Sequence, residues 1–325
     1  MFDLTMNDGF LFHTKKSKPV EIGRPLAPLA DTHTHLTSVR GLNVPHIIAR
    51  AQAAGVHLMV VPVDPSDEGV SALSVLTQLT FWQNRAEIVA GELRADKVEF
   101  PVFTPEPQYN LPGHLRILAG VHPYGAAALD DDMKNQINIL LMDKRCVGIG
   151  EIGLDYHCDV DRDTQIDAFR EQLSMARRRN LPVELHIRDA VGDEACQAHA
   201  DAVDILKKDG MPDAGCILHC FTQGPEVMKA FVDLDCYIAF GGASTFKNSD
   251  DIRRACVACP EHLILSETDA PYMAPHPLRG QQCESAMVAL VCENLAQVRQ
   301  QAGVASMQAT YDALWNNACR IFRNA

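Results

Sequence analysis

The chain has 325 residues, and its 47% hydrophobic content is enough to bury a sizeable core without disulfides, which excludes disordered and fibrous proteins. Its 42 Asp and Glu residues outnumber its 29 Lys and Arg residues, and the formal net charge of -13 excludes a broad basic surface for nucleic acid. The 11 cysteines follow no repeating spacing, and no apolar run approaches the roughly 18 residues of a membrane span, so we expect a reducing, cytoplasmic location and no membrane partner.

Regular elements are predicted to begin near residue 28. Residues 1–27 lack a clear hydrophobic periodicity and are interpreted as an N-terminal extension of a single domain spanning 28–325. The predicted strands, short runs rich in Val, Ile and Leu, are 28–35, 57–63, 116–122, 146–152, 182–187, 215–221, 236–242 and 262–269. The predicted helices are 43–54, 70–91, 162–179, 189–208, 225–233, 249–258, 282–302 and 306–322. The segment 92–115 contains four prolines and is predicted to be an insertion before the third strand.

Eight strands that alternate with helices favour an α/β fold, a TIM-like (β/α)8 barrel. An open, doubly wound sheet is the alternative architecture. Such a sheet would have a Gly-rich phosphate turn after its first strand, whereas "DTHTHLTS" stands in that place. The pattern therefore indicates a closed barrel, in which reactive residues gather where the strands end.

Histidines and carboxylates stand at the ends of five predicted strands. They are His33 and His35 on the first strand, Glu151 on the fourth, His186 on the fifth, His219 on the sixth and Asp269 on the eighth. A lone histidine is more often a hydrogen-bonded core residue, but six such side chains at matching strand ends indicate a metal site, since imidazoles suit zinc and similar ions and carboxylates bridge ions. Asp31 and Glu267, two residues before ligands on the same faces, are interpreted as deeper orienting groups.

Seven motifs resemble those of the TatD-type metal-dependent deoxyribonucleases, hydrolases with an amidohydrolase-like barrel. The resemblance extends from residue 28 to the end of the chain. It rests on "DTHTHL" (31–36), "GVHP" (120–123), "VGIGEIGLDY" (147–156), "PVELHIRDA" (182–190), "HCF" (219–221), "FGGASTFKN" (240–248) and "SETDAPYMAP" (266–275). The resemblance implies the metal-dependent hydrolase type of (β/α)8 barrel, with two divalent metal ions.

The resemblance also implies a ligand set. One ion would be bound by His33, His35, Glu151 and Asp269. The other would be bound by Glu151, His186 and His219, so that Glu151 bridges the pair. Zinc, magnesium and manganese all accept such mixed histidine and carboxylate ligands, so the ligand types do not select one metal.

The implied activity is hydrolysis of phosphodiester bonds by a deoxyribonuclease, an exonuclease directed at the 3′ end, with single-stranded DNA ends as its nucleic acid substrate. Water activated by the metals would attack phosphorus, with Asp269 as the base and Glu151 as the second catalytic residue. His122, Tyr156 and Arg188 stand just beyond strand ends and are predicted to contact the substrate. No stable protein partner is predicted.

Some residues depart from the usual motifs of the family. Tyr124 stands where a second histidine often follows "GVHP". "HCF" is followed by "TQG" at 222–224, where Ser-Gly is usual. These departures leave the metal ligands unchanged and bear on the shape of the substrate cleft.

Two rival functions remain open at the level of sequence. The first is a deacylase or other amidohydrolase-type enzyme that cleaves an ester or amide on the same barrel. Many such enzymes bridge their ions with a modified lysine on the fourth strand, where this chain has Glu151. The second is a non-catalytic scaffold, which would be expected to have lost ligands.

Overall fold

An eight-stranded parallel sheet forms the centre of the protein. The computed structural model describes residues 10–67, 69–96, 98–109, 111 and 113–322. The strands of the sheet are β3 (Leu29–Asp31), β4 (Val56–Val63), β5 (Leu115–Ala119), β6 (Cys146–Asp155), β7 (Val183–Arg188), β8 (Cys216–Leu218), β9 (Tyr237–Phe240) and β10 (Ile264–Ser266). Each strand pairs in parallel with the next one along the chain.

Contacts between the first and last strands of this sheet close it into a barrel. The backbone N–H of Thr32 donates to the carbonyl of Ser266 at 3.1 Å, and Thr34 forms a parallel bridge with Ala270. The Ser266 hydroxyl donates to the Ala30 carbonyl at 2.9 Å. The predicted TIM-like (β/α)8 barrel is confirmed, and the carboxyl ends of all eight strands meet at one rim.

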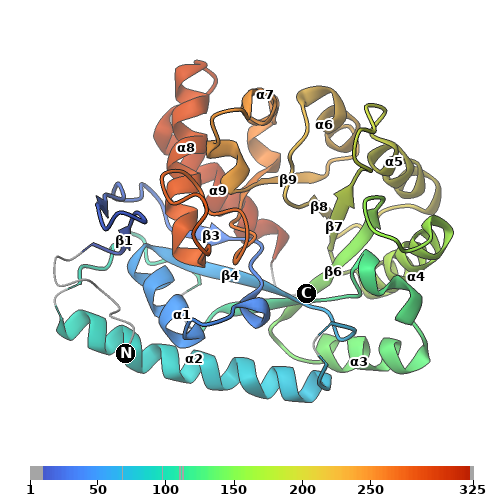
Figure 1. Cartoon of the computed structure of the whole chain (residues 1–325), viewed down its shortest axis with the longest axis horizontal. Helices are drawn as coiled ribbons and strands as arrows, with labels where there is room; N and C mark the ends of the chain where they lie inside the picture. The colour runs from blue at the N-terminus through green and yellow to red at the C-terminus, as the bar shows by residue number, and fades with distance from the viewer. Residues whose placement is uncertain (1–9, 68, 97, 110, 112, 323–325) are drawn as a thin grey trace.

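Helices surround the strands in Figure 1, where the long helix α2 runs along the lower edge of the molecule. The described helices are α1 (Val44–Ala53), α2 (Ala72–Ala95), α3 (Asp131–Leu141), α4 (Arg162–Arg179), α5 (Gln197–Asp209), α6 (Pro225–Val232), α7 (Asp250–Ala258), α8 (Val288–Gln301) and α9 (Met307–Ile321). Short 3-10 turns are η1 (Leu36–Ser38), η2 (Pro123–Ala128), η3 (Gly242–Thr245), η4 (Glu261–Leu263) and η5 (Ser285–Met287). Within the described ranges, no helix combines the length and apolar character that crossing a membrane requires.

Local sequence explains where these elements form. The strand β4 is a nearly continuous apolar run because both faces of a barrel strand are covered, one by the interior and one by helices. The helix α4 begins where the Asp161 side chain accepts a hydrogen bond from Thr164 N at 3.1 Å. It ends at Asn180, whose left-handed φ of 50° stops the helix.

The structure differs from the sequence prediction in two helices. The helix α3 was absent from the predicted set, although Asp130 caps it by accepting from Met133 N at 2.9 Å. The predicted helix 189–208 begins only at Gln197, because Gly192 and Cys196 adopt positive φ angles in the loop before it. Both differences lie outside the barrel strands, so they leave the arrangement of the rim unchanged.

The N-terminal segment and the Pro-rich segment both contain features that the sequence did not predict. Within 1–27, β1 (Phe12–His13) and β2 (Pro19–Val20) pair as a short antiparallel hairpin. Within 92–115, the first residues continue α2 up to Ala95, and β5 begins at Leu115. The division of the chain at these points stays a prediction.

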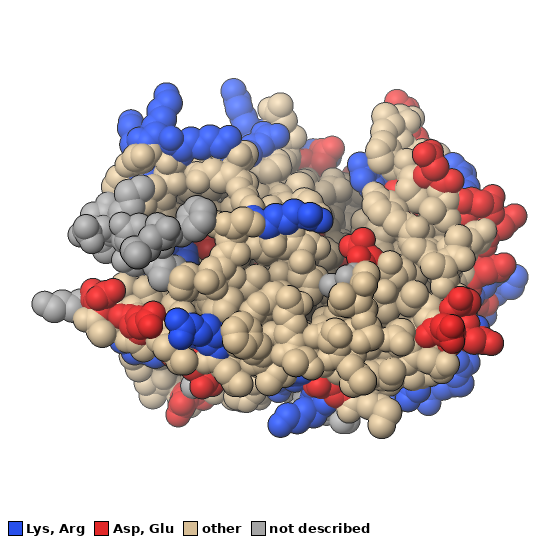
Figure 2. Space-filling view, turned by 60° about the horizontal axis from the view of Figure 1, so that its bottom comes forward, with Lys and Arg blue, Asp and Glu red and all other residues tan. Residues whose placement is uncertain are grey.

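Charged side chains on the face seen in Figure 2 lie mainly around its periphery. The centre of this face is largely uncharged, and Asp and Glu side chains gather toward its right-hand edge. Lys and Arg side chains gather along its upper left edge, and no broad basic patch covers its centre.

The glycine at 242 is expected to be required for folding. A Cβ atom on Gly242 would lie 1.8 Å from the Met273 carbonyl oxygen, so Gly242→Ala should lower the free energy of unfolding by about 2–3 kcal/mol through overpacking. Gly91 in α2 has no atom within 4 Å of such a Cβ, so Gly91→Ala should raise that free energy by about 0.5–1 kcal/mol. Urea unfolding of both variants measures the contrast, and equal midpoints would contradict the close approach at residue 242.

Candidate metal centre

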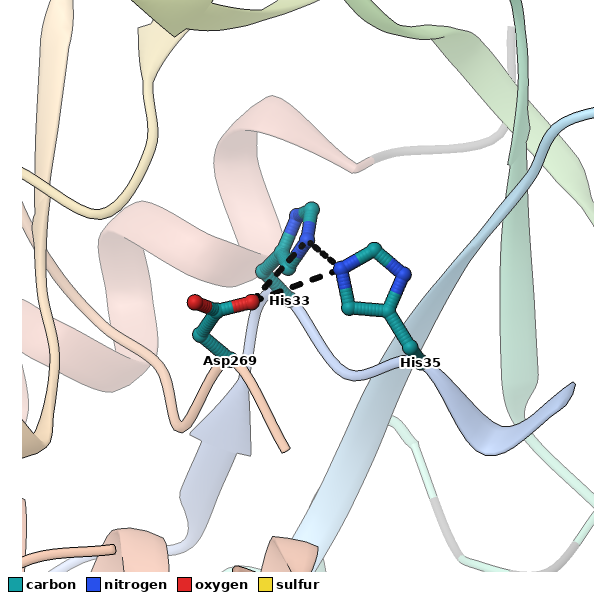
Figure 3. A group of neighbouring side chains, drawn as sticks. All are labelled: His33, His35 and Asp269. Carbon is teal, nitrogen blue, oxygen red and sulfur yellow. Dashed lines mark hydrogen bonds and ion pairs between the residues drawn. The ribbon is translucent and has the colours of Figure 1, made fainter. Parts of the chain in front are cut away.

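The two histidines of "DTHTH" lie just beyond the end of β3 and face Asp269. The Asp269 N–H donates to the His33 carbonyl at 3.0 Å, and the His35 N–H donates to the Ala270 carbonyl at 2.7 Å. These backbone bonds bring the three side chains together, as Figure 3 shows. The Nε2 atoms of His33 and His35 are 3.0 Å apart and lie 3.8 and 3.3 Å from Asp269 Oδ1.

A second group forms around Glu151, which lies in the middle of β6 because this strand continues to Asp155, beyond its predicted end at residue 152. Its Oε1 lies 3.0 Å from Nδ1 of His186 and 3.0 Å from Nε2 of His219. Its Oε2 lies 3.6 Å from Nε2 of His33 and 3.7 Å from Nε2 of His35. The structure thus brings all six sequence-predicted ligands together, with one oxygen of Glu151 toward each group.

His122, predicted from sequence as a substrate contact, lies closer to the centre than that interpretation implies. Its Nε2 is 3.7 Å from Glu151 Oε1, and with Glu151 and His186 it forms a third set of ligand atoms within 4.8 Å of one another. Its backbone N–H donates to Asp64 Oδ2 at 2.8 Å, and its Nδ1 accepts from Tyr124 N at 3.1 Å. These contacts hold the ring with Nε2 toward the centre.

The donor set at this centre fits a divalent cation. Among the described residues, Glu151 forms ion pairs only with histidines. No Lys or Arg among these residues neutralises its buried carboxylate. Burial alone would raise the pKa of Glu151, but the imidazoles of His219 and His33 hold it well below its usual range. Burial and the neighbouring His219 hold the pKa of His33 well below its usual range. A carboxylate among imidazoles is the ligand chemistry of zinc and similar ions.

Buried carboxylates lie behind the histidines and hold their rings. Asp155 Oδ2 is 3.0 Å from Nε2 of His186, opposite the ring atom that faces Glu151. Burial alone would lower the pKa of His186, but hydrogen bonds to Asp155 and Glu151 raise it to about 9. The negative charge that favours a proton here also favours a metal cation.

Glu184 on β7 was missed by the sequence analysis. Its side chain is fully buried, and its Oε1 lies 2.6 Å from Nδ1 of His33. Burial, followed by the charges of Glu267 and Glu151, raises the pKa of Glu184 well above its usual range. Glu184 stands two residues before the ligand His186 on the same strand, which is the spacing that singled out Asp31 and Glu267.

Asp31 and Glu267 lie below the rim and are also fully buried. Asp31 accepts hydrogen bonds from Thr268 N at 2.8 Å and from the Ser285 hydroxyl, and burial raises its pKa to about 7. Glu267 accepts a hydrogen bond at 2.6 Å from the backbone N–H of Cys220, the residue that follows the predicted ligand His219. Both carboxylates therefore accept hydrogen bonds from residues next to predicted ligands: Asp31 from Thr268 and Glu267 from Cys220.

A cavity of about 570 Å³ opens above the centre. Only some of the residues predicted to contact the substrate line this cavity. His122 and Arg188 line it. Tyr156 does not: its ring is 7% exposed, its hydroxyl donates to Asp201 Oδ2 at 2.6 Å, and the Arg162 guanidinium lies over it. The structure therefore brings two of the three predicted contacts to the cavity and leaves Tyr156 in the core.

Comparisons with known proteins agree with this barrel and this centre. The sequence profile described as TatD related DNase matches residues 30–323. The chain is 36% identical over 205 residues to the uncharacterized metal-dependent hydrolase YabD of Bacillus subtilis, which covers 63% of this chain and 76% of the relative. It is 27% identical over 261 residues to the uncharacterized metal-dependent hydrolase TatD of Mycobacterium tuberculosis, over 78% of this chain and 83% of the relative. Its fold is similar to the crystal structure of YjjV, a TatD homolog of Escherichia coli K12, with a TM-score of 0.69 and 24% identity over 91% of this chain and 98% of that one. The chain therefore belongs to the TatD-related DNase family and is a metal-dependent hydrolase.

Proposed function

We propose that this hydrolase cleaves phosphodiester bonds at the 3′ ends of single-stranded DNA, with two divalent ions at the centre. The observation that carries the proposal is the position of Glu151, whose two carboxylate oxygens face different groups of ligands. A carboxylate in that position would be able to hold two cations, one with each oxygen. His33, His35 and Asp269 would complete the first site.

The second site would be completed by His186 and His219, with His122 close enough to join it. When bound, divalent ions would favour ionisation of a water molecule and neutralise charge on phosphate oxygens. Two divalent ions would contribute four positive charges, and Glu151 and Asp269 contribute two negative ones. The net positive charge of the centre would attract a phosphate, although the whole chain is acidic.

Asp269 is the proposed base. Its side chain lines the cavity and keeps 14% of its surface exposed, so water reaches its carboxylate. Its Oδ1 faces His35 at 3.3 Å, and its Oδ2, which also accepts from the Cys220 thiol at 3.7 Å, would accept a proton from a water in the cavity. Glu151 is almost enclosed by histidines and is better suited to binding cations than to moving protons.

The proposal is tested with the full chain loaded with manganese. We expect it to shorten a single-stranded oligonucleotide from a free 3′ end, to leave a 3′-blocked copy intact, and to lose and regain this activity on chelation and reloading. An aminoacyl ester and an amide serve as the deacylase arm of the test. Hydrolysis of the ester or amide without any cleavage of DNA would overturn the proposal.

Arg188 is proposed to bind a phosphate oxygen of the substrate. It lines the cavity at the end of β7, and a guanidinium forms charge-assisted hydrogen bonds to phosphate. Arg188→Met should raise KM for the oligonucleotide about 10- to 150-fold, because one such bond is worth roughly 1.5–3 kcal/mol. Arg254→Met on the exposed face of α7 is the matched control, and its KM should equal that of the wild type. An unchanged KM in Arg188→Met would exclude the contact.

Glu184 is proposed to fix the ring of His33 for metal binding. The 2.6 Å contact to Glu184 favours the His33 tautomer with its proton on Nδ1, in which Nε2 would offer its lone pair to a cation. Glu184→Leu should therefore weaken binding of one of the two ions about 10- to 100-fold, whereas Glu184→Gln retains an acceptor and should lose less. Titration calorimetry with manganese measures both, and urea unfolding checks that the barrel is intact. Equal affinities in the two variants would contradict this role.

A further inference from the structure

Two exposed tyrosines flank the candidate metal centre. Four of the six tyrosines are buried: Tyr109, Tyr156, Tyr237 and Tyr311. Tyr124 and Tyr272 are instead 55% and 56% exposed, and both line the cavity of about 570 Å³. Leaving two large aromatic rings in water at one cavity forgoes hydrophobic stabilisation, so a binding role for both is indicated.

Each of these rings stands beside a different group of ligands. The Tyr272 ring centroid is 6.0 Å from that of His35, which groups with His33 and Asp269. The Tyr124 ring centroid is 4.5 Å from that of His122, which groups with Glu151 and His186. A phosphate held at the centre would therefore have an aromatic ring to either side.

Backbone contacts hold both tyrosines to the centre. The Tyr272 N–H donates to the Asp269 carbonyl at 2.9 Å. The Tyr124 N–H donates to Nδ1 of His122 at 3.1 Å. The backbone of each tyrosine is therefore bonded to a residue of the ligand groups, in the segments after β10 and β5, which lie three strands apart around the closed barrel.

The cavity offers little charge for a long nucleic acid backbone. Arg188 is the sole Lys or Arg among its described lining residues, while Asp64 and Asp67 add negative charge beside the ligands. A protein that follows several phosphates needs a row of cations. Recognition here must come mainly from contacts to one phosphate and to uncharged parts of the substrate.

We propose that Tyr124 and Tyr272 are stacking platforms for the two nucleobases on either side of the cleaved phosphodiester, an inference that rests on the proposed function. Aromatic rings stack on any base, so the substrate class is an unpaired dinucleotide step of any sequence. Bases inside a duplex are stacked on one another and cannot reach two separate rings. The specificity for unpaired ends thus comes from stacking and not from a basic groove.

Binding of a dinucleotide with a non-hydrolysable phosphonate linkage to the manganese-loaded full chain tests the platforms. Tyr124→Ala and Tyr272→Ala should each weaken Kd about 5- to 150-fold, the range of one base stack, whereas Tyr124→Phe and Tyr272→Phe should stay within about twofold. A ligand with the same linkage but abasic sugars should bind all of these variants as it binds the wild type. Met142→Ala, at an exposed position on the loop after α3, is the control and should bind like the wild type.

The outcomes separate this inference from the proposed function. Alanine variants that bind the dinucleotide as tightly as the wild type, or phenylalanine variants that weaken it as much as alanine does, would overturn the platforms even if the wild type cleaves DNA. Failure of the wild type to bind the dinucleotide would overturn them as well. Loss of binding in the alanine variants, with no cleavage of any phosphodiester by the wild type, would support the platforms and refute the nuclease.

Discussion

Glu151→Ala is expected to abolish hydrolysis and to empty both metal sites. Glu151 lies within 3.0 Å of His186 and His219 and within 3.7 Å of His33 and His35, so one substitution removes an oxygen ligand from each group. Metal ions stabilise the transition state of hydrolysis by several kcal/mol, so the rate should fall at least about a thousandfold. The measurements are kcat on an oligonucleotide and the metal content of the same sample.

Glu92→Gln, at an exposed position in α2, is the matched control for this substitution and should retain both activity and metal. Circular dichroism and urea unfolding of Glu151→Ala should show a folded barrel, because the Glu151 side chain contacts the histidines of the centre and takes no part in the packing of helices on strands. A Glu151→Ala protein that keeps its metals and its rate would remove the bridging carboxylate from the mechanism.

Asp269→Asn is expected to separate proton transfer from metal binding. Asparagine keeps the shape of the side chain and an oxygen toward His35 but cannot accept a proton. If Asp269 is the base, kcat should fall about 100- to 10,000-fold, while KM changes little. The ion held by Glu151, His186 and His219 should remain, since none of these ligands is altered.

The pattern of kcat, KM and metal content distinguishes this result from that of Glu151→Ala. Asp269→Asn should retain at least one ion per chain and lose rate, whereas Glu151→Ala should lose both ions. Asp269→Glu restores a carboxylate and should recover part of the rate. A normal kcat in Asp269→Asn would assign the proton to another group of the cavity.

The sequence predicted the barrel and the convergence of ligands because both follow from simple geometry. Alternation of apolar runs with helical segments is typical of parallel sheets, and parallel strands bring their ends to one rim. His33 and Asp269 are 236 residues apart in the sequence, yet a backbone hydrogen bond of 3.0 Å joins their residues. Strand ends alone were enough to predict that proximity.

Other features depend on tertiary contacts that no local pattern carries. His33 and His35 follow β3 and do not belong to it. Their backbone groups form hydrogen bonds with Asp269 and Ala270 in the segment after β10, where the barrel closes. The burial of Tyr156 depends on Asp201 from α5 and on Arg162 from α4. Its position just beyond the end of a strand gave no indication of these partners.

Local sequence patterns indicate both Glu184 and α3, although neither was among the predicted features. The two-residue spacing of Glu184 from His186 marks it as a neighbour of the centre on the same face of β7. The acids Asp130, Asp131 and Asp132 mark the start of a helix, through a side-chain cap and charges that suit its first turn. Burial of the Glu184 carboxylate against His33 required the barrel itself, since the two residues come from different strands.

Counting metals in the purified full chain tests the central claim most directly. After loading with manganese and dialysis against buffer without metal, mass spectrometry of the ions should find about two per chain in the wild type and none in Glu151→Ala. The same preparations should cleave DNA only when the ions are present. A wild-type protein that hydrolyses its substrate while holding no divalent ion would contradict the account.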